Sequence, residues 1–307
     1  MRDRTSQPVA EPPAAAESGG PSNLVLRIVS ALGLAPVALG AAWLGDWVFA
    51  LFWLAAALIV LWEWIHLVAG PGHKLMFSAS ASALTVAAMV EFRERPVAAA
   101  LLIVLGAIAS LIFAQRRHRL WVTAGIGYAG TMLLAPMLLR ADPDYGFFAI
   151  VLIFAVVWTT DVMAYFTGHA VGGPKLCPAV SPKKTWSGAV GGTLCATAVA
   201  FALSRAAAVG NPANLALIGL MLSVLAQVGD LLESWIKRRF GAKDASHLIP
   251  GHGGVMDRLD GFWAAALVGC LIGLAHGGLH NAAEMRAFHQ HVEEGLKLYH
   301  VTGLGNE

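Results

Sequence analysis

The stretch QVGDLLESWIKRRFGAKDASHLIPGHGGVMDRLDG, residues 227–261, organises the rest of the chain. It places ten acidic and basic side chains between two long apolar runs, in a protein of which only 13% of residues are charged. Carboxylates lie at both ends of the stretch and bases lie between them, in the order Asp230, Glu233, Lys237, Arg238, Arg239, Lys243, Asp257 and Asp260. This layout is typical of carboxylates that hold a cation and bases that bind phosphates at the edge of a membrane.

The composition indicates a membrane protein. Of the 307 residues, 57% are hydrophobic, and the mean hydropathy is +0.64, above what a soluble domain of this size normally carries. The net charge of +2 is too small to indicate nucleic-acid binding, and the bases are expected to lie in loops. Three cysteines, odd in number and without metal-ligand spacing, predict neither a disulfide framework nor a zinc site.

Nine apolar segments have a length suited to crossing a hydrocarbon core of roughly 30 Å. The predicted fold is therefore an all-α, polytopic integral membrane protein with about nine transmembrane helices. The predicted spans are 24–44, 47–68, 75–90, 97–114, 120–139, 147–166, 187–203, 215–232 and 261–279. In the seventh span, Gly188 and Gly192 form a small-xxx-small pattern that is typical of close helix packing.

The segments outside the spans are predicted to be accessory. Residues 1–23 are rich in Pro, Ala, Ser, Gly and Glu and predict a disordered tail rather than a signal peptide. Residues 24–280 form the membrane domain. Residues 281–307 form a polar tail with room for one short amphipathic helix.

The distribution of basic residues predicts the orientation. If nine segments span, the N-terminus and the loops after spans two, four, six and eight hold 15 of the 21 Lys and Arg residues. This bias places the N-terminus and those loops in the cytoplasm.

Two upstream segments carry polar residues that suit a functional site. Asp161 lies near the cytoplasmic end of the sixth span, where an ionisable group is costly and usually functional, although a structural hydrogen bond between helices is the alternative. The following loop, 167–186, is expected to lack secondary structure, and it ends in Ser181-Pro-Lys183-Lys184-Thr. Adjacent lysines beside hydroxyls are suited to binding phosphate oxygens. Alternatively, the two lysines only determine the membrane topology or contact anionic lipid.

The eighth and ninth spans predict a metal site. Gln227, Asp230, Ser234 and Lys237 share one helical stripe, with Glu233 at its border, and Asp257 and Asp260 open the ninth span. Carboxylates without His or Cys neighbours favour a hard cation such as Mg²⁺. The glycine-rich turn around His252 could approach a phosphate, or it could be a plain turn between helices.

At this point the residues resemble a known family, the phosphatidate cytidylyltransferases, also called CDP-diacylglycerol synthases. The matching pattern is Ser234-x-Ile-Lys237-Arg238-x4-Lys243-Asp-x-Ser-x2-Ile-Pro-x-His252-Gly-Gly-Val-x-Asp257-Arg258-Leu-Asp260. Asp161-x-x-Ala-Tyr165 and Ser181-Pro-Lys-Lys-Thr185 are similar to upstream motifs of that family, so the resemblance covers residues 158–261. The first 145 residues show only the expected hydrophobicity.

The resemblance implies a multi-pass enzyme of a bacterial-type inner membrane that condenses phosphatidate with CTP to give CDP-diacylglycerol and pyrophosphate. It implies that the enzyme requires Mg²⁺ and can use a second cation. It also implies a cytoplasmic active site in a protein that contacts membrane lipids, binds no nucleic acid and can form a homodimer. The implied metal ligands are Asp230, Asp257 and Asp260. The implied catalytic residues are Asp230, Asp257, Lys237, Arg238 and Lys243. The implied substrate-binding residues are Ser181, Lys183, Lys184, Ser234, His252, Arg258 and Asp161.

Three other functions compete with this hypothesis. An ion-coupled transporter would use Asp161 and Asp230, but the charges gather at one face instead of the midplane. A lipid kinase that uses CTP would need the same Mg²⁺ and phosphate-binding residues. A phosphatidyltransferase that consumes CDP-diacylglycerol would be expected to show an Asp-Gly-x2-Ala-Arg motif, which the sequence lacks.

Overall fold

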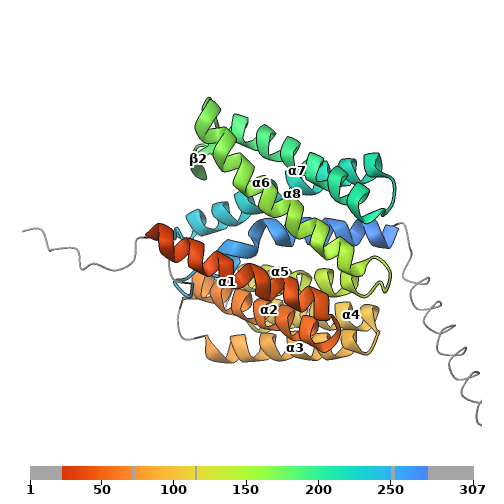
Figure 1. Ribbon diagram of the computed structural model, residues 1–307. Coiled ribbons are helices and arrows are strands. Elements are labelled where there is room, and N and C mark those ends of the chain that lie inside the picture. The colour runs from red at the N-terminus through yellow and green to blue at the C-terminus, as the bar shows by residue number, and fades with distance from the viewer. Residues whose placement is uncertain (1–22, 71–72, 115, 250–252, 276–307) are drawn as a thin grey trace, which may run out of the picture.

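The computed structural model describes residues 23–70, 73–114, 116–249 and 253–275, and these are almost entirely helical. Each of the nine predicted spans coincides, at least over most of its length, with one helix; the predicted tails, apart from Asn23, lie outside the described residues. The helices in Figure 1 are α1 (Asn23–Leu44), α2 (Asp46–Ala69), α3 (Lys74–Phe92), α4 (Pro96–Phe113), α5 (Arg119–Arg140), α6 (Gly146–Val171), α7 (Trp186–Ala207) and α8 (Pro212–Arg239), followed by the unlabelled helix Met256–Ala275.

Seven of these helices are long and apolar enough to cross a membrane: α2, α3, α5, α6, α7, α8 and Met256–Ala275. The apolar parts found in α1 and α4, Gly33–Leu44 and Pro96–Ile112, are shorter, so the count of nine spans stays a prediction. Large apolar side chains are exposed along the outer helices, which favours lipid as their surroundings. On α4 they are Val97, Leu101, Val104, Leu105, Ile108, Leu111 and Ile112. The described chain has the character of a polytopic helical membrane protein.

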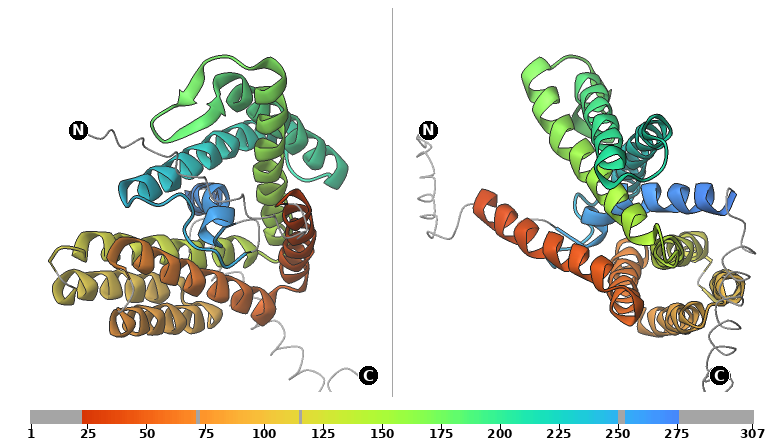
Figure 2. Two further views of the ribbon diagram at one scale, coloured as in Figure 1. Left: turned by 90° about the vertical axis from the view of Figure 1, so that its left-hand side faces the viewer. Right: turned by 45° about the vertical axis from the view of Figure 1, so that its right-hand side comes forward.

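The helix Met256–Ala275 joins two groups of helices. Helices α2 to α5 pack against one another, and so do α6, α7 and α8. Figure 2 shows Met256–Ala275, in blue, between these groups. Its Phe262 stacks on Trp53 of α2 and on Phe154 of α6, with ring centroids 4.8 and 4.6 Å apart. Both groups therefore determine where this helix lies.

Small residues let neighbouring backbones approach closely. A Cβ atom added at Gly192 of α7 would lie 2.6 Å from the carbonyl oxygen of Thr160 in α6, and one at Gly188 would lie 2.6 Å from that of Ala164. The predicted packing role of these two glycines is confirmed. Likewise, a Cβ atom at Gly229 of α8 would lie 2.7 Å from the carbonyl oxygen of Asp260. This contact brings α8 against the start of Met256–Ala275.

The segment 167–186 differs from the predicted unstructured loop. Helix α6 continues to Val171, and two antiparallel strands follow, β1 (Lys175–Cys177) and β2 (Ser181–Thr185). Lys175 pairs with Thr185, and Cys177 pairs with Ser181. The Thr185 side chain then accepts a hydrogen bond from Gly188 N–H (3.1 Å) and caps α7. The hairpin is the exception to the all-α prediction among the described residues.

The basic cluster after the eighth span is not a loop at its start. Lys237, Arg238 and Arg239 form the last turn of α8, where positive charge is favourable near the unpaired carbonyl groups. Lys237 is buried. Lys237 lies on the helix, as its place on the predicted stripe requires. The expectation of a loop was wrong for Arg238 and Arg239, because the apolar pattern ends before the helix does.

Candidate active site

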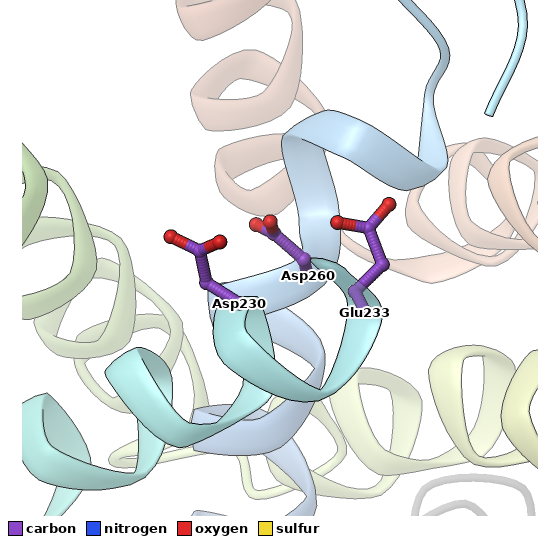
Figure 3. Close-up of side chains that lie close together, drawn as sticks. All are labelled: Asp230, Glu233 and Asp260. Atoms are coloured by element: carbon purple, nitrogen blue, oxygen red, sulfur yellow. The ribbon is translucent and has the colours of Figure 1, made fainter. Parts of the chain in front are cut away.

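Three carboxylates meet where α8 crosses the start of the helix Met256–Ala275. Asp230 and Glu233 come from successive turns of α8, and Asp260 comes from the other helix (Figure 3). One oxygen of each lies within 4.8 Å of an oxygen of the other two. The acid trio, as we call these three residues, depends on the close contact at Gly229, which leaves no room for a side chain between the helices.

The acid trio fits a hard cation. Glu233 is completely buried, and its Oε1 atom accepts no hydrogen bond from the part of the chain that the structure describes. An unpaired buried carboxylate oxygen is costly, and a divalent cation removes that cost. Three carboxylates without His or Cys are the oxygen ligands that Mg²⁺ prefers.

Two lysines balance part of this negative charge. Lys184 of β2 forms an ion pair with Asp230. Lys237 donates to Glu233 Oε2 (2.9 Å) and also pairs with Asp257. Since Lys237 and Glu233 are one helical turn apart and both buried, α8 carries a charged pair into the protein interior.

A cavity of about 690 Å³ opens beside the acid trio, at the end of the bundle where α6 passes through the hairpin into α7. Of the predicted site residues, its lining includes Asp161, Lys183, Lys184, Asp230, Lys237, Asp257, Arg258 and Asp260. Tyr165, His169, Lys175 and Asp244 also line it. Carboxylates at one side and Lys and Arg around them can hold a metal together with a polyphosphate.

Other predicted site residues lie outside this lining. Ser234 contacts the site indirectly, through a hydrogen bond of 3.4 Å from its hydroxyl to Asp230. Arg238 is exposed and donates to the carbonyl oxygen of Ala242 (2.9 Å). Ser181 and Lys243 are not part of the lining, and His252 lies outside the described residues.

Asp257 is engaged on both carboxylate oxygens. Oδ1 pairs with Lys237, and Oδ2 accepts the N–H groups of Ala245 (2.9 Å) and Gly254 (2.7 Å). The carboxylate thus ties the loop after α8 to the start of the next helix. Its predicted role as a metal ligand stays a prediction.

Sequence reasoning gave too little weight to two buried acids that contact the site or its loop. Glu233 was placed only at the border of the polar stripe. Glu63 of α2 was not selected at all, yet it is completely buried and accepts hydrogen bonds from three groups of the loop and turn around residues 246–256. The sequence carries a signal for Glu63, because an ionisable residue within an apolar span is usually functional, as at Asp161.

Comparison with known proteins places the sequence in a family. A model of the Cytidylyltransferase family matches residues 25–274, which includes the half of the chain without recognised motifs. A phosphatidate cytidylyltransferase of Brucella abortus biovar 1 is 42% identical over 253 residues, covering 82% of this chain and 94% of the relative. One of Pseudomonas aeruginosa is 37% identical over 259 residues, covering 78% of this chain and 93% of the relative. The chain therefore belongs to the cytidylyltransferase family.

Proposed function

We propose that the protein condenses phosphatidate with CTP to give CDP-diacylglycerol and pyrophosphate. The observation that carries this proposal is the acid trio, flanked by Lys184 and Lys237, beside a cavity large enough for a nucleotide phosphate chain. The relatives at 42% and 37% identity are both phosphatidate cytidylyltransferases, and each is covered almost over its full length.

The reaction joins one phosphatidate oxygen to the α-phosphorus of CTP and breaks the bond from that phosphorus to the bridging oxygen of the β-phosphate. A phosphate monoester has its second pKa near 6, so phosphatidate is mostly a dianion at neutral pH and needs no general base. The electron pair of the broken bond leaves with pyrophosphate. Catalysis then consists of positioning the two anions and neutralising their charge.

In this proposal the acidic and basic residues of the site have different roles. Asp230, Glu233 and Asp260 would hold a divalent cation, which supplies charge neutralisation for the phosphates when bound. Lys183, Lys184 and Arg258 line the cavity as cations that can contact phosphate oxygens. Lys237 orients Glu233 through its hydrogen bond. Asp257 holds the loop and the turn that enclose the cavity, and we retain it as a further candidate metal ligand.

The membrane arrangement belongs to the same proposal. All nine helices cross a bacterial inner membrane, with the cavity open to the cytoplasm, where CTP is made available. The support is the distribution of basic residues in the sequence: nine spans would put 15 of the 21 Lys and Arg residues on the side of the N-terminus, which is also the predicted side of the site. Mg²⁺ as the ion and a homodimer as the assembly also stay proposals.

Labelled CTP tests the reaction. With purified protein and Mg²⁺, label at the α position should enter lipid only when phosphatidate is present, because the cytidine monophosphate unit stays with the lipid. Label at the γ position should appear in pyrophosphate. Label that enters lipid from the γ position and not from the α position would assign the protein as a CTP-dependent lipid kinase instead.

A further inference from the structure

Glu63 connects the helical group without recognised motifs to the loop and helix that carry the site. Its Oε1 atom accepts hydrogen bonds from the Ser246 hydroxyl (2.6 Å) and from Val255 N–H (2.9 Å), and its Oε2 atom accepts Met256 N–H (2.7 Å). The side chain is completely buried. None of the three ion pairs around the site involves Glu63, so hydrogen-bond donors hold this carboxylate.

Two of these donors, the N–H groups of Val255 and Met256, are groups that a helix start leaves unpaired. The first N–H groups of Met256–Ala275 have no partner within that helix, and the positive end of its dipole favours a carboxylate. Glu63 supplies this cap from α2, more than 190 residues earlier in the chain. Asp257, within the helix, accepts the preceding Gly254 N–H, so Glu63 and Asp257 together satisfy the N–H groups at this helix start.

The cap determines where Asp260 lies. Asp260 is one helical turn beyond Met256, and its distance from Asp230 and Glu233 depends on the position of that turn. The Ser246 contact also fixes the loop after α8 to the same carboxylate. We propose that Glu63 is a positioning residue, which holds the start of Met256–Ala275 and the loop in register so that the acid trio can bind its cation. The inference rests on the metal site of the proposed function.

Glutamine is not a conservative replacement at this site. Glu63→Gln keeps one acceptor oxygen, but its amide NH₂ would face a second N–H donor, which leaves a buried group unpaired. Such a loss should change the equilibrium constant about tenfold, which corresponds to roughly 1.4 kcal/mol. Ser246→Ala removes only one of the three bonds and should have a smaller effect of about threefold.

The test measures Mn²⁺ binding, through the electron paramagnetic resonance signal of the free ion, with purified protein that receives no substrate. Glu63→Gln should weaken Mn²⁺ binding about tenfold, and Ser246→Ala about threefold. Asp46→Asn, which removes the same charge from the exposed start of α2, should leave binding within twofold of the unaltered protein. A merely structural role would lower the melting temperature without changing the affinity of the protein that remains folded.

Unchanged Mn²⁺ affinity in folded Glu63→Gln protein would overturn the inference. If that variant does not fold, unchanged affinity in Ser246→Ala decides against it in the same way. The proposed reaction is tested separately, since Mn²⁺ binding by the unaltered protein does not require that CTP be consumed.

A pocket on the other side of α8 indicates a second binding site. It has a volume of about 450 Å³ and is lined by Val68, Arg117, His118, Trp121, Arg239 and Phe240. Arg239 is two residues from Lys237, so the two side chains point roughly 200° apart around the helix axis. The pocket is thus separate from the acid trio although it lies at the same end of the bundle.

The pocket combines positive charge with aromatic walls. Arg117 and Arg239 are exposed, and none of the ion pairs among the described residues involves them or His118. Trp121 packs edge-on against Phe240, with ring centroids 5.0 Å apart, and next to Trp235 at 6.0 Å. Tryptophan at a helix end is typical of the membrane interface, and basic pockets between cytoplasmic helix ends bind lipid head groups.

We infer that this basic aromatic pocket binds the phosphate of an anionic phospholipid, with Trp121 and Phe240 against its glycerol and upper acyl region. Native mass spectrometry of protein that has been equilibrated with phosphatidylglycerol measures this. Replacing Arg117 and Arg239 together by Gln should lower lipid retention about tenfold. Replacing Arg116 and Arg119 together by Gln removes equal charge from exposed neighbours that do not line the pocket, and it should change retention less than twofold.

Three results would overturn the lipid assignment. Equal loss in both double variants would mean that general surface charge holds the lipid. Full retention in the Arg117 and Arg239 variant would place the lipid elsewhere. Displacement of phosphatidylglycerol by millimolar inorganic phosphate would assign the pocket to a soluble phosphate ligand.

Discussion

Lys184 of β2 and Asp230 of α8 form an ion pair across the candidate site, although 46 residues separate them in the sequence. The pair brings the hairpin against the acid trio. Both side chains are partly exposed to the cavity, so either can exchange this partner for a ligand of the site. A cation could replace Lys184 as the partner of Asp230, and a phosphate could replace Asp230 as the partner of Lys184.

Replacing Asp230 should abolish most of the activity. Asp230→Asn keeps the size of the side chain but removes a charged ligand, and the rate should fall by about 100-fold or more at fixed Mg²⁺. Asp142→Asn is the control, because the Asp142 Oδ1 atom accepts the N–H groups of Asp144 and Tyr145 in a turn that asparagine can also make. Full activity of Asp230→Asn would mean that the cation is held elsewhere.

Replacing Lys184 should impair substrate binding. Lys184→Met removes a phosphate contact and leaves Asp230 without its lysine, so we expect the KM for at least one substrate to rise about tenfold, with Lys184→Arg in between. Steady-state kinetics with CTP and phosphatidate varied separately measures this. Lys74→Met, at the exposed start of α3, should retain the KM values of the unaltered protein. Unaltered KM and kcat values in Lys184→Met would remove this residue from the site.

The contact between α6 and α7 should not tolerate a larger residue. In Gly192→Ala the new Cβ atom would lie 2.6 Å from the Thr160 carbonyl oxygen, and forcing the helices apart typically costs about 1–3 kcal/mol. The melting temperature in detergent should fall. Gly127→Ala in α5 meets nothing within 4 Å and should be neutral or slightly stabilising. Equal melting temperatures for both variants would contradict the close packing.

Cysteine labelling tests the orientation. In a background without Cys177, Cys195 and Cys270, single cysteines at positions 118, 180 and 245 should react only with a reagent that reaches the cytoplasmic side. A cysteine at position 142 should react from outside. Labelling of position 180 or 245 from outside would reverse the proposed topology.

The helices were predictable because apolar runs report burial in lipid or protein directly. The ends were less predictable. Spans six and eight were predicted to end at residues 166 and 232, whereas α6 and α8 continue to Val171 and Arg239. A hydropathy pattern ends at the first polar residues, but a helix continues wherever its backbone bonds and caps remain favourable. The hairpin was missed because hydrophobic periodicity does not show which two short segments pair as strands.

The site was predictable where its residues share a motif. Asp230, Lys237 and Asp260 were expected near one another, and the structure places them around one cavity. Glu233 was underestimated because its position on the stripe does not reveal that it is completely buried. Glu63 could not be connected with the site at all, because its partners lie more than 180 residues away and only tertiary packing brings them together.

The contact between Glu63 and Met256 also sets an order of events during synthesis. Met256 is made 193 residues after Glu63, which at about 5–20 residues per second corresponds to roughly 10–40 s. Until Ser246 is made, 183 residues after Glu63, the Glu63 carboxylate lacks every partner that it has in the finished protein. An unpaired acid in an apolar helix is costly in lipid, so α2 should remain at the insertion machinery or near water until the last helices arrive. Nascent chains arrested before residue 246 should therefore leave α2 more accessible to chemical labelling than chains arrested after residue 275.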